Sequence, residues 1–102
     1  MRRAARTDGN HTEVVRALRQ AGMTVQSLAA VGQGVPDLLI GWRGLNLLAE
    51  VKDGDKPPSA RTLTANETKW HESWGGHVVV VRDPDGAVEA MLDYWRRLGG
   101  GL

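Results

Sequence analysis

Val35-Pro36-Asp37-Leu38-Leu39-Ile40 and Leu47-Leu48-Ala49-Glu50-Val51-Lys52 are two apolar runs that carry only three charged residues between them. We expect both to be β-strands, at about 35–41 and 46–52, joined by a turn centred on Arg43-Gly44. A hairpin folded at this turn pairs Ile40 with Leu47 and brings Asp37 opposite Glu50. Because side chains on one face of a strand alternate with period two, Lys52 shares that face with Glu50.

Two opposed carboxylates repel each other, so their placement on apolar strands indicates a positive ion between them. Mg²⁺ prefers oxygen ligands and usually keeps several waters, so Asp37, Glu50 and the backbone carbonyl of Val51 suffice as a predicted site. Such an ion activates water toward a phosphodiester, and Lys52 would stabilise the developing charge or help to activate that water.

The alternative interpretation is that no metal site exists and that the strand face is solvated, with Glu50 and Lys52 loosely paired. The spacing of the three charged residues is weak evidence by itself, because it occurs by chance in many chains. Pro36 directly before Asp37, and the apolar residues on both sides, favour a built site.

The composition predicts one small domain over residues 1–102, with a basic tail at 1–9 and a frayed glycine tail at 99–102. The formal charge is only +1, so no strong global field attracts a polyanion. The absence of cysteine excludes disulfides and thiolate zinc sites. No apolar stretch approaches the roughly 20 residues of a membrane span, so we expect a soluble intracellular protein without a membrane partner.

Hydrophobic periodicity and turn residues predict an α/β fold in the order α-β-β-β-α-β-α, with one mixed sheet of about four strands flanked by helices. Besides the hairpin, we expect a helix at 10–21, a strand at 23–30, a helix at 65–74, a strand at 77–82 and a helix at 87–98. Thr64 and Glu67 form a predicted capping box. The valine strand at 77–82 is expected to be buried on both faces and parallel to a hairpin strand. Residues 83–86 are expected to form a turn.

Gly34-Val35-Pro36-Asp37-Leu38-Leu39-Ile40 followed by Ala49-Glu50-Val51-Lys52 resembles the PD-(D/E)XK nuclease superfamily. The Gly-Val-Pro-Asp form in so short a chain is most similar to stand-alone members of its VRR-NUC branch. The resemblance covers about residues 10–82 and implies a small restriction-endonuclease-like fold. It also implies an endonuclease that hydrolyses DNA with Mg²⁺ or Mn²⁺, in which Asp37 and Glu50 are metal ligands and Lys52 is the catalytic lysine.

The resemblance points to further site residues. The first helix of the family often contributes an acidic ligand, and Glu13 holds the matching position; alternatively, Glu13 is the reciprocal half of an N-terminal cap with Asn10. The family often carries a Gln in the helix after the lysine strand, where this chain has Glu67, which we interpret as a cap for Thr64 outside the site. Gln33 either contacts the site or the DNA, or is only a loop residue.

The stand-alone members resemble Holliday-junction resolvases, which act as dimers with one site per strand. The resemblance therefore implies branched DNA as substrate, a homodimer, and a cytoplasmic location in a bacterial or phage-infected cell. Of the four tryptophans, Trp42, Trp70, Trp74 and Trp95, most are expected in the core, with one or two available to a subunit interface. Three basic residues flank the polar loop at 53–62 and are predicted to contact the DNA backbone: Lys56, Arg61 and Lys69.

Two other functions compete with this hypothesis. The first is a non-catalytic DNA-binding or assembly module with a nuclease-like fold, against which the intact Asp37, Glu50 and Lys52 argue. The second is a non-nuclease α/β domain with solvated strand charges, which predicts no metal affinity and tolerance of Asp37→Asn.

Overall fold

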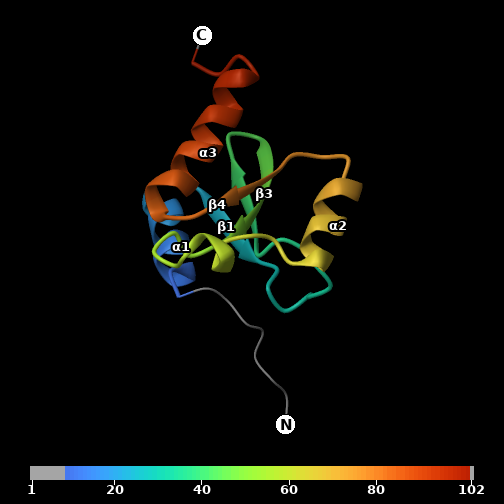
Figure 1. Ribbon diagram of the computed structural model, residues 1–102. Coiled ribbons are helices and arrows are strands. Elements are labelled where there is room, and N and C mark those ends of the chain that lie inside the picture. The colour runs from blue at the N-terminus through green and yellow to red at the C-terminus, as the bar shows by residue number, and fades with distance from the viewer. Residues whose placement is uncertain (1–8, 102) are drawn as a thin grey trace.

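The computed structural model describes residues 9–101, which form one mixed sheet with helices on both sides (Figure 1). The elements follow the predicted order and are α1 (His11–Gln20), β1 (Thr24–Ser27), β2 (Leu38–Trp42), β3 (Leu45–Val51), the 3₁₀ helix η1 (Pro58–Ala60), α2 (Ala65–Ser73), β4 (Val78–Val81) and α3 (Pro84–Arg97). The basic tail predicted at 1–9 lies, apart from Gly9, outside the described residues. No helix within residues 9–101 is both long and apolar enough to cross a bilayer.

The hairpin of β2 and β3 has the predicted register. Ile40 pairs with Leu47, and Trp42 pairs with Leu45 across the turn. The turn residues Arg43 and Gly44 have φ values of 50° and 81°, and positive φ at both central residues gives the twist that an antiparallel hairpin needs. The first strand starts later than expected, so that Asp37 lies directly before β2 rather than within it.

The sheet order is β1-β2-β3-β4, and β4 runs parallel to β3, as expected for a crossover through α2. The expectation that the valine strand is buried on both faces is wrong. Only Val81 is buried, and the other three valines of β4 are half-buried. The reason is its place at the edge of the sheet, where the strand has a neighbour on one side only.

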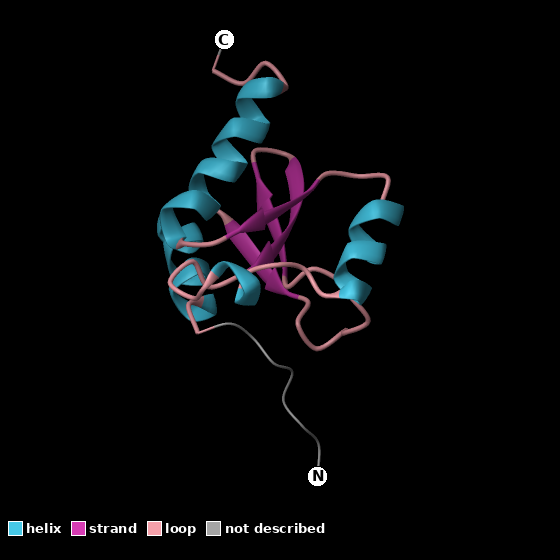
Figure 2. Ribbon diagram, in the orientation of Figure 1, coloured by secondary structure: helices cyan, strands magenta, loops and turns pink. Residues whose placement is uncertain are grey.

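The core lies on one face of the sheet, where α1 and α3 pack against it (Figure 2). This face carries Leu38 and Ile40 of β2 and Leu47, Ala49 and Val51 of β3, all fully buried. Because strand side chains alternate, Glu50 and Lys52 belong to the opposite face, the side on which α2 lies (Figure 1).

Two helix starts are set by local side chains. Thr64 and Glu67 form the predicted capping box at α2. The turn expected at 83–86 is instead the first turn of α3, in which Asp83 accepts a hydrogen bond from the Gly86 N–H and Pro84 takes the first helical position. Proline suits that position because its missing N–H would have no intrahelical partner there.

Candidate functional site

Asp37 and Glu50 are both buried at the point where β2 begins and β3 ends, with 9% and 3% of their surface exposed. The Val51 N–H donates a 2.9 Å hydrogen bond to Oδ2 of Asp37. This bond ties the residue before β2 to the last residue of β3, and so holds the Asp37 carboxylate beside its neighbour Glu50. The structure therefore brings the two acids together, as the hairpin register predicted.

Glu50 has an unusual electrostatic environment. Burial raises its pKa from 4.5 to about 9, and the neighbouring carboxylates of Asp37 and Glu67 add to the rise. Its Oε1 atom is buried and has no hydrogen-bond partner, although buried carboxylate oxygens normally have one. A cation bound there would satisfy this oxygen and relieve the repulsion from Asp37.

Lys52 lies on the same face, with 8% of its surface exposed. Its Nζ atom is 3.9 Å from Oε2 of Glu50 and 2.8 Å from Oε1 of Glu67. The shorter distance is a charge-assisted hydrogen bond, whereas the longer one is only an electrostatic contact. Of these two carboxylates, the one bonded to Lys52 is that of Glu67 in α2, a contact which the sequence did not predict.

Glu67 forms the predicted cap of Thr64 and in addition contacts Lys52, so it adjoins the candidate site residues. Its Oε1 atom accepts a hydrogen bond from the Thr64 N–H at 2.9 Å, as a capping box requires, and also accepts the bond from Lys52. Burial alone would raise the pKa of Glu67, but the bonds from Lys52 and the Thr64 backbone outweigh it and lower the pKa overall. The position of the family's Gln was the signal that could have identified this residue.

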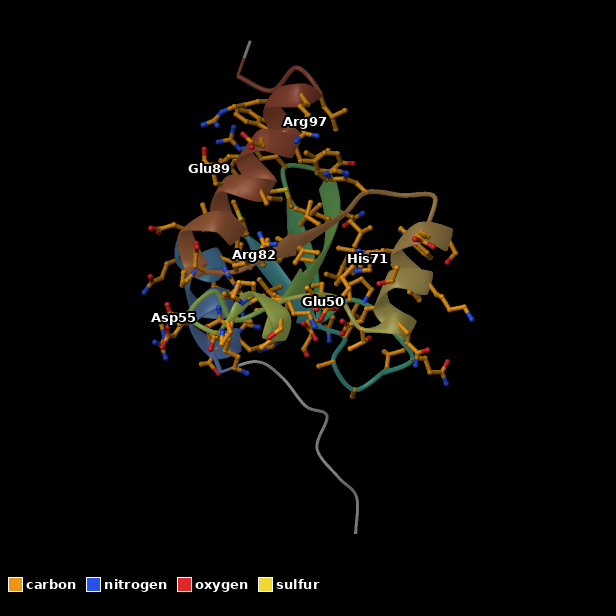
Figure 3. The ribbon with its side chains drawn as sticks, in the orientation of Figure 1. Glu50, Asp55, His71, Arg82, Glu89 and Arg97 are labelled. Carbon is orange, nitrogen blue, oxygen red and sulfur yellow. The ribbon has the colours of Figure 1, made fainter. Side chains whose placement is uncertain are left out.

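A second residue of α2, His71, lies in the field of Glu67 and Lys52. It lies one turn after Glu67 on α2, and its Nε2 atom is buried without a hydrogen-bond partner. Figure 3 shows Glu50 and His71 between the strands and α2. Burial lowers the pKa of His71, Lys52 lowers it further, and Glu67 opposes both. His71 is therefore half-buried, and its imidazole lies in the electrostatic field of Glu67 and Lys52.

The structure does not gather Glu13 with the other acids. Glu13 is exposed on the first turn of α1. Within residues 9–101, no group of three His, Asp or Glu side chains is placed to hold a metal ion. The alternative cap is not formed by the Asn10 side chain either, because its Oδ1 atom accepts no hydrogen bond; its Nδ2 atom donates to the carbonyl of Arg82 at 2.8 Å and that of Lys52 at 3.4 Å.

Two cavities flank the acids. One, of about 420 Å³, is lined by Asp37 and Glu67 and by the loop before β2, which includes Gln33. The other, of about 640 Å³, is lined by Arg61, Arg82, Thr68 and Val80. Val80 pairs with Glu50 in the parallel register and Thr68 follows Glu67, so the second cavity is lined by neighbours of the acids, and only the first by the acids themselves.

The predicted DNA-contacting residues are distributed unevenly around these cavities. Gln33 and Arg61 line them, and the Nε atom of Arg61 is buried without a hydrogen-bond partner. Lys56 and Lys69 are exposed and are not among the residues that line either cavity.

The tryptophans divide into two pairs. Trp42 and Trp95 make an edge-to-face contact with centroids 5.4 Å apart, and the Arg43 guanidinium lies over both rings at 4.4 and 4.5 Å. Trp70 and Trp74 stack with centroids 4.6 Å apart, and 48% of Trp74 is exposed. The first pair packs the hairpin turn against α3, whereas Trp74 presents an aromatic surface to solvent.

Comparison with known proteins adds a solved structure described as a VRR_NUC domain. It superposes with a TM-score of 0.59, is 26% identical in sequence, and the match covers 81% of this chain and 90% of that one. No family model matches the sequence, and no curated protein matches it. Together with the element order and the paired acids beside a lysine, this match shows that the chain has the VRR-NUC, PD-(D/E)XK-like nuclease fold.

Proposed function

We propose that this protein is a divalent-metal-dependent endonuclease that hydrolyses phosphodiester bonds in DNA. The observation that carries the proposal is the buried, unpartnered Oε1 atom of Glu50 beside the Asp37 carboxylate. When Glu50 is ionised, the three carboxylates and the Lys52 ammonium carry a formal charge of −2. One divalent cation would neutralise this cluster.

The donor set suits Mg²⁺ or Mn²⁺. Asp37 and Glu50 supply hard carboxylate oxygens, and the Val51 carbonyl is the third proposed protein ligand; Glu13 lies outside this set. An ion held by so few protein ligands keeps several waters, as Mg²⁺ commonly does. When bound, the ion supplies Lewis-acid polarisation of the phosphate and lowers the pKa of coordinated water.

Lys52 and Asp37 have the two remaining proposed roles in hydrolysis. Lys52 holds a fixed positive charge beside the acids, where negative charge develops on the phosphate oxygens as water adds to phosphorus. Hydrolysis adds one water across the P–O bond and leaves a phosphate end and a hydroxyl end. Asp37 keeps its position through the bond from the Val51 N–H, so little reorganisation is needed at the moment of reaction.

The substrate path is proposed from the two cavities. Arg61 and Arg82 supply positive charge in the cavity beside Val80, where they are suited to contact phosphates without reading sequence. Gln33 lines the cavity on the other side of Glu67 and is proposed to contact the strand there. Lys56 and Lys69, both exposed, are proposed as outer phosphate contacts.

Branched DNA such as a Holliday junction is the proposed preferred substrate, and a homodimer is the proposed active form. The exposed Trp74, stacked on Trp70, supports an interface on α2. The cysteine-free sequence fits a reducing compartment, so we place the activity in the cytoplasm.

The test is cleavage of labelled four-way junction, flap, duplex and single-stranded DNA with Mg²⁺, Mn²⁺ or EDTA. We expect cutting with either ion, none with EDTA, and the fastest cutting of the junction. Sedimentation of the same preparation should show a dimer. A preparation that binds DNA but neither binds Mn²⁺ nor cuts any substrate would support the non-catalytic module instead.

A further inference from the structure

The two carboxylates next to Lys52 are not equivalent partners. Nζ of Lys52 is 2.8 Å from Oε1 of Glu67, within hydrogen-bond distance, but 3.9 Å from Oε2 of Glu50, beyond it. The other oxygen of Glu50, Oε1, has no hydrogen-bond partner. The ammonium therefore lies on the α2 side of the site and leaves Glu50 unbonded by it.

Glu67 is itself fixed by the start of α2. Its carboxylate accepts the Thr64 N–H at 2.9 Å, and its own N–H donates to the Thr64 hydroxyl at 3.2 Å. The loop before β2 supports the same turn, because Gly34 lies so close to the Asn66 carbonyl that a Cβ there would clash with it. A carboxylate held in this way loses little conformational entropy when it binds the ammonium.

We propose that Glu67 is a positioning residue that holds Lys52 away from Glu50 and so keeps the Glu50 carboxylate open to a cation. The proposal rests on the proposed function, because it assigns Glu67 a role in that same site. Without the charge of Glu67, Glu50 is the one of these two carboxylates that still attracts the ammonium. Lys52 would then move onto Glu50 and compete with the cation for the same oxygens.

Glu67→Gln isolates this role, because Gln completes a capping box as Glu does. We expect the variant to keep its melting temperature but to bind Mn²⁺ about tenfold more weakly, as measured by calorimetry without DNA. Thr64→Ala is the matched control, since it removes the cap hydroxyl and leaves the Glu67 carboxylate. It should lower the melting temperature and change Mn²⁺ affinity much less than Glu67→Gln does, because the Thr64 N–H still holds the carboxylate.

A double-mutant cycle separates positioning from simple loss of negative charge. If Lys52 moves onto Glu50 in the Glu67→Gln variant, then adding Lys52→Met to that variant should raise its Mn²⁺ affinity about tenfold. The same Lys52→Met substitution in the parent protein should change Mn²⁺ affinity much less. Equal effects of Lys52→Met in both backgrounds would overturn the positioning role.

A crystal structure of Glu67→Gln keeps the proposal testable if Lys52→Met does not fold. It should show Nζ of Lys52 within hydrogen-bond distance of Glu50, and an ammonium that stays in place would overturn the proposal. Failure of the parent protein to bind Mn²⁺ would overturn the proposed function together with this inference. Mn²⁺ binding by the parent without coupling between Glu67 and Lys52 would overturn this inference alone.

Discussion

Asp37 accepts a 2.9 Å hydrogen bond from the backbone N–H of Val51, so a side chain at the start of one strand is bound to the end of its neighbour. This bond uses one carboxylate oxygen, Oδ2, of a buried side chain. It also means that the structure itself needs a hydrogen-bond acceptor at position 37, independently of any catalytic role.

Asp37→Asn should separate these two roles. The amide oxygen of Asn can still accept the Val51 N–H, so we expect the melting temperature to change little. Loss of the charge should reduce DNA cleavage about 100-fold or more, with DNA affinity largely retained. Asp93→Asn, which removes an exposed acid from α3, is the control and should cut like the parent. A fully active Asp37→Asn protein would show that the acid pair does not form the site.

Glu50→Gln should make the metal-free protein more stable at alkaline pH. The pKa of Glu50 is about 9 in the fold against 4.5 as the reference value for an unperturbed Glu, so the folded state binds the extra proton and stability falls as pH rises between these values. Gln carries no such proton, and each unit of pKa difference is worth about 1.4 kcal/mol.

The free energy of unfolding of Glu50→Gln should therefore equal that of the parent near pH 4. At pH 8 it should exceed that of the parent by more than about 1 kcal/mol, or at least about 4–8 °C in melting temperature. Thermal unfolding of both proteins in EDTA from pH 4 to pH 8 measures this difference. A difference between the two proteins that does not vary with pH would contradict the raised pKa of Glu50.

Gly34→Ala should destabilise the contact between the loop before β2 and the start of α2. Gly34 has φ +85°, and an added Cβ would meet the Asn66 backbone. We expect a loss of about 2 kcal/mol or more in the free energy of unfolding. Gly32→Ala is the control, since φ there is +71° with open space around the Cβ position. It should cost about 1 kcal/mol, the strain of the left-handed backbone alone. Equal losses in the two variants, measured by denaturant unfolding, would exclude the contact with α2.

Arg61→Met should weaken DNA binding without changing the rate at which bound DNA is cleaved. Removing one phosphate contact should reduce the slope of log affinity against log salt by about one. Arg97→Met is the control, because Arg97 lies at the far end of α3, away from Glu50 (Figure 3). Fluorescence anisotropy over a series of salt concentrations, with single-turnover cleavage beside it, tests this. A lower single-turnover rate at saturating protein would instead place Arg61 at the reacting phosphate.

The hairpin and the acid pair were predictable because local rules specify them. The turn at Arg43-Gly44 and the alternation of side chains set the register, and the register sets which residues face each other. The element order followed from periodicity and turn residues for the same reason.

The contact between Glu67 and Lys52 was not predictable in this way. It depends on where the loop at 53–62 and the Gly34 contact place α2 against the sheet, and no local pattern encodes that position. The valines of β4 gave a misleading signal, since four apolar residues in a row suit an edge strand as well as a central one. Residues 83–86 were ambiguous because Asp-Pro-Asp-Gly suits both a turn and a helix start.

The two-residue turn of the hairpin has a consequence for how this protein can change in evolution. A single inserted or deleted residue between Trp42 and Leu45 that no bulge absorbs would shift the pairing by one and exchange the two faces of β3 relative to β2. Glu50 and Lys52 would then point into the hydrophobic core, and Ala49 and Val51 would lie on the opposite face. A register shift of this kind would abolish folding and function together, so we expect the length of this turn to vary less in evolution than its exposed residues.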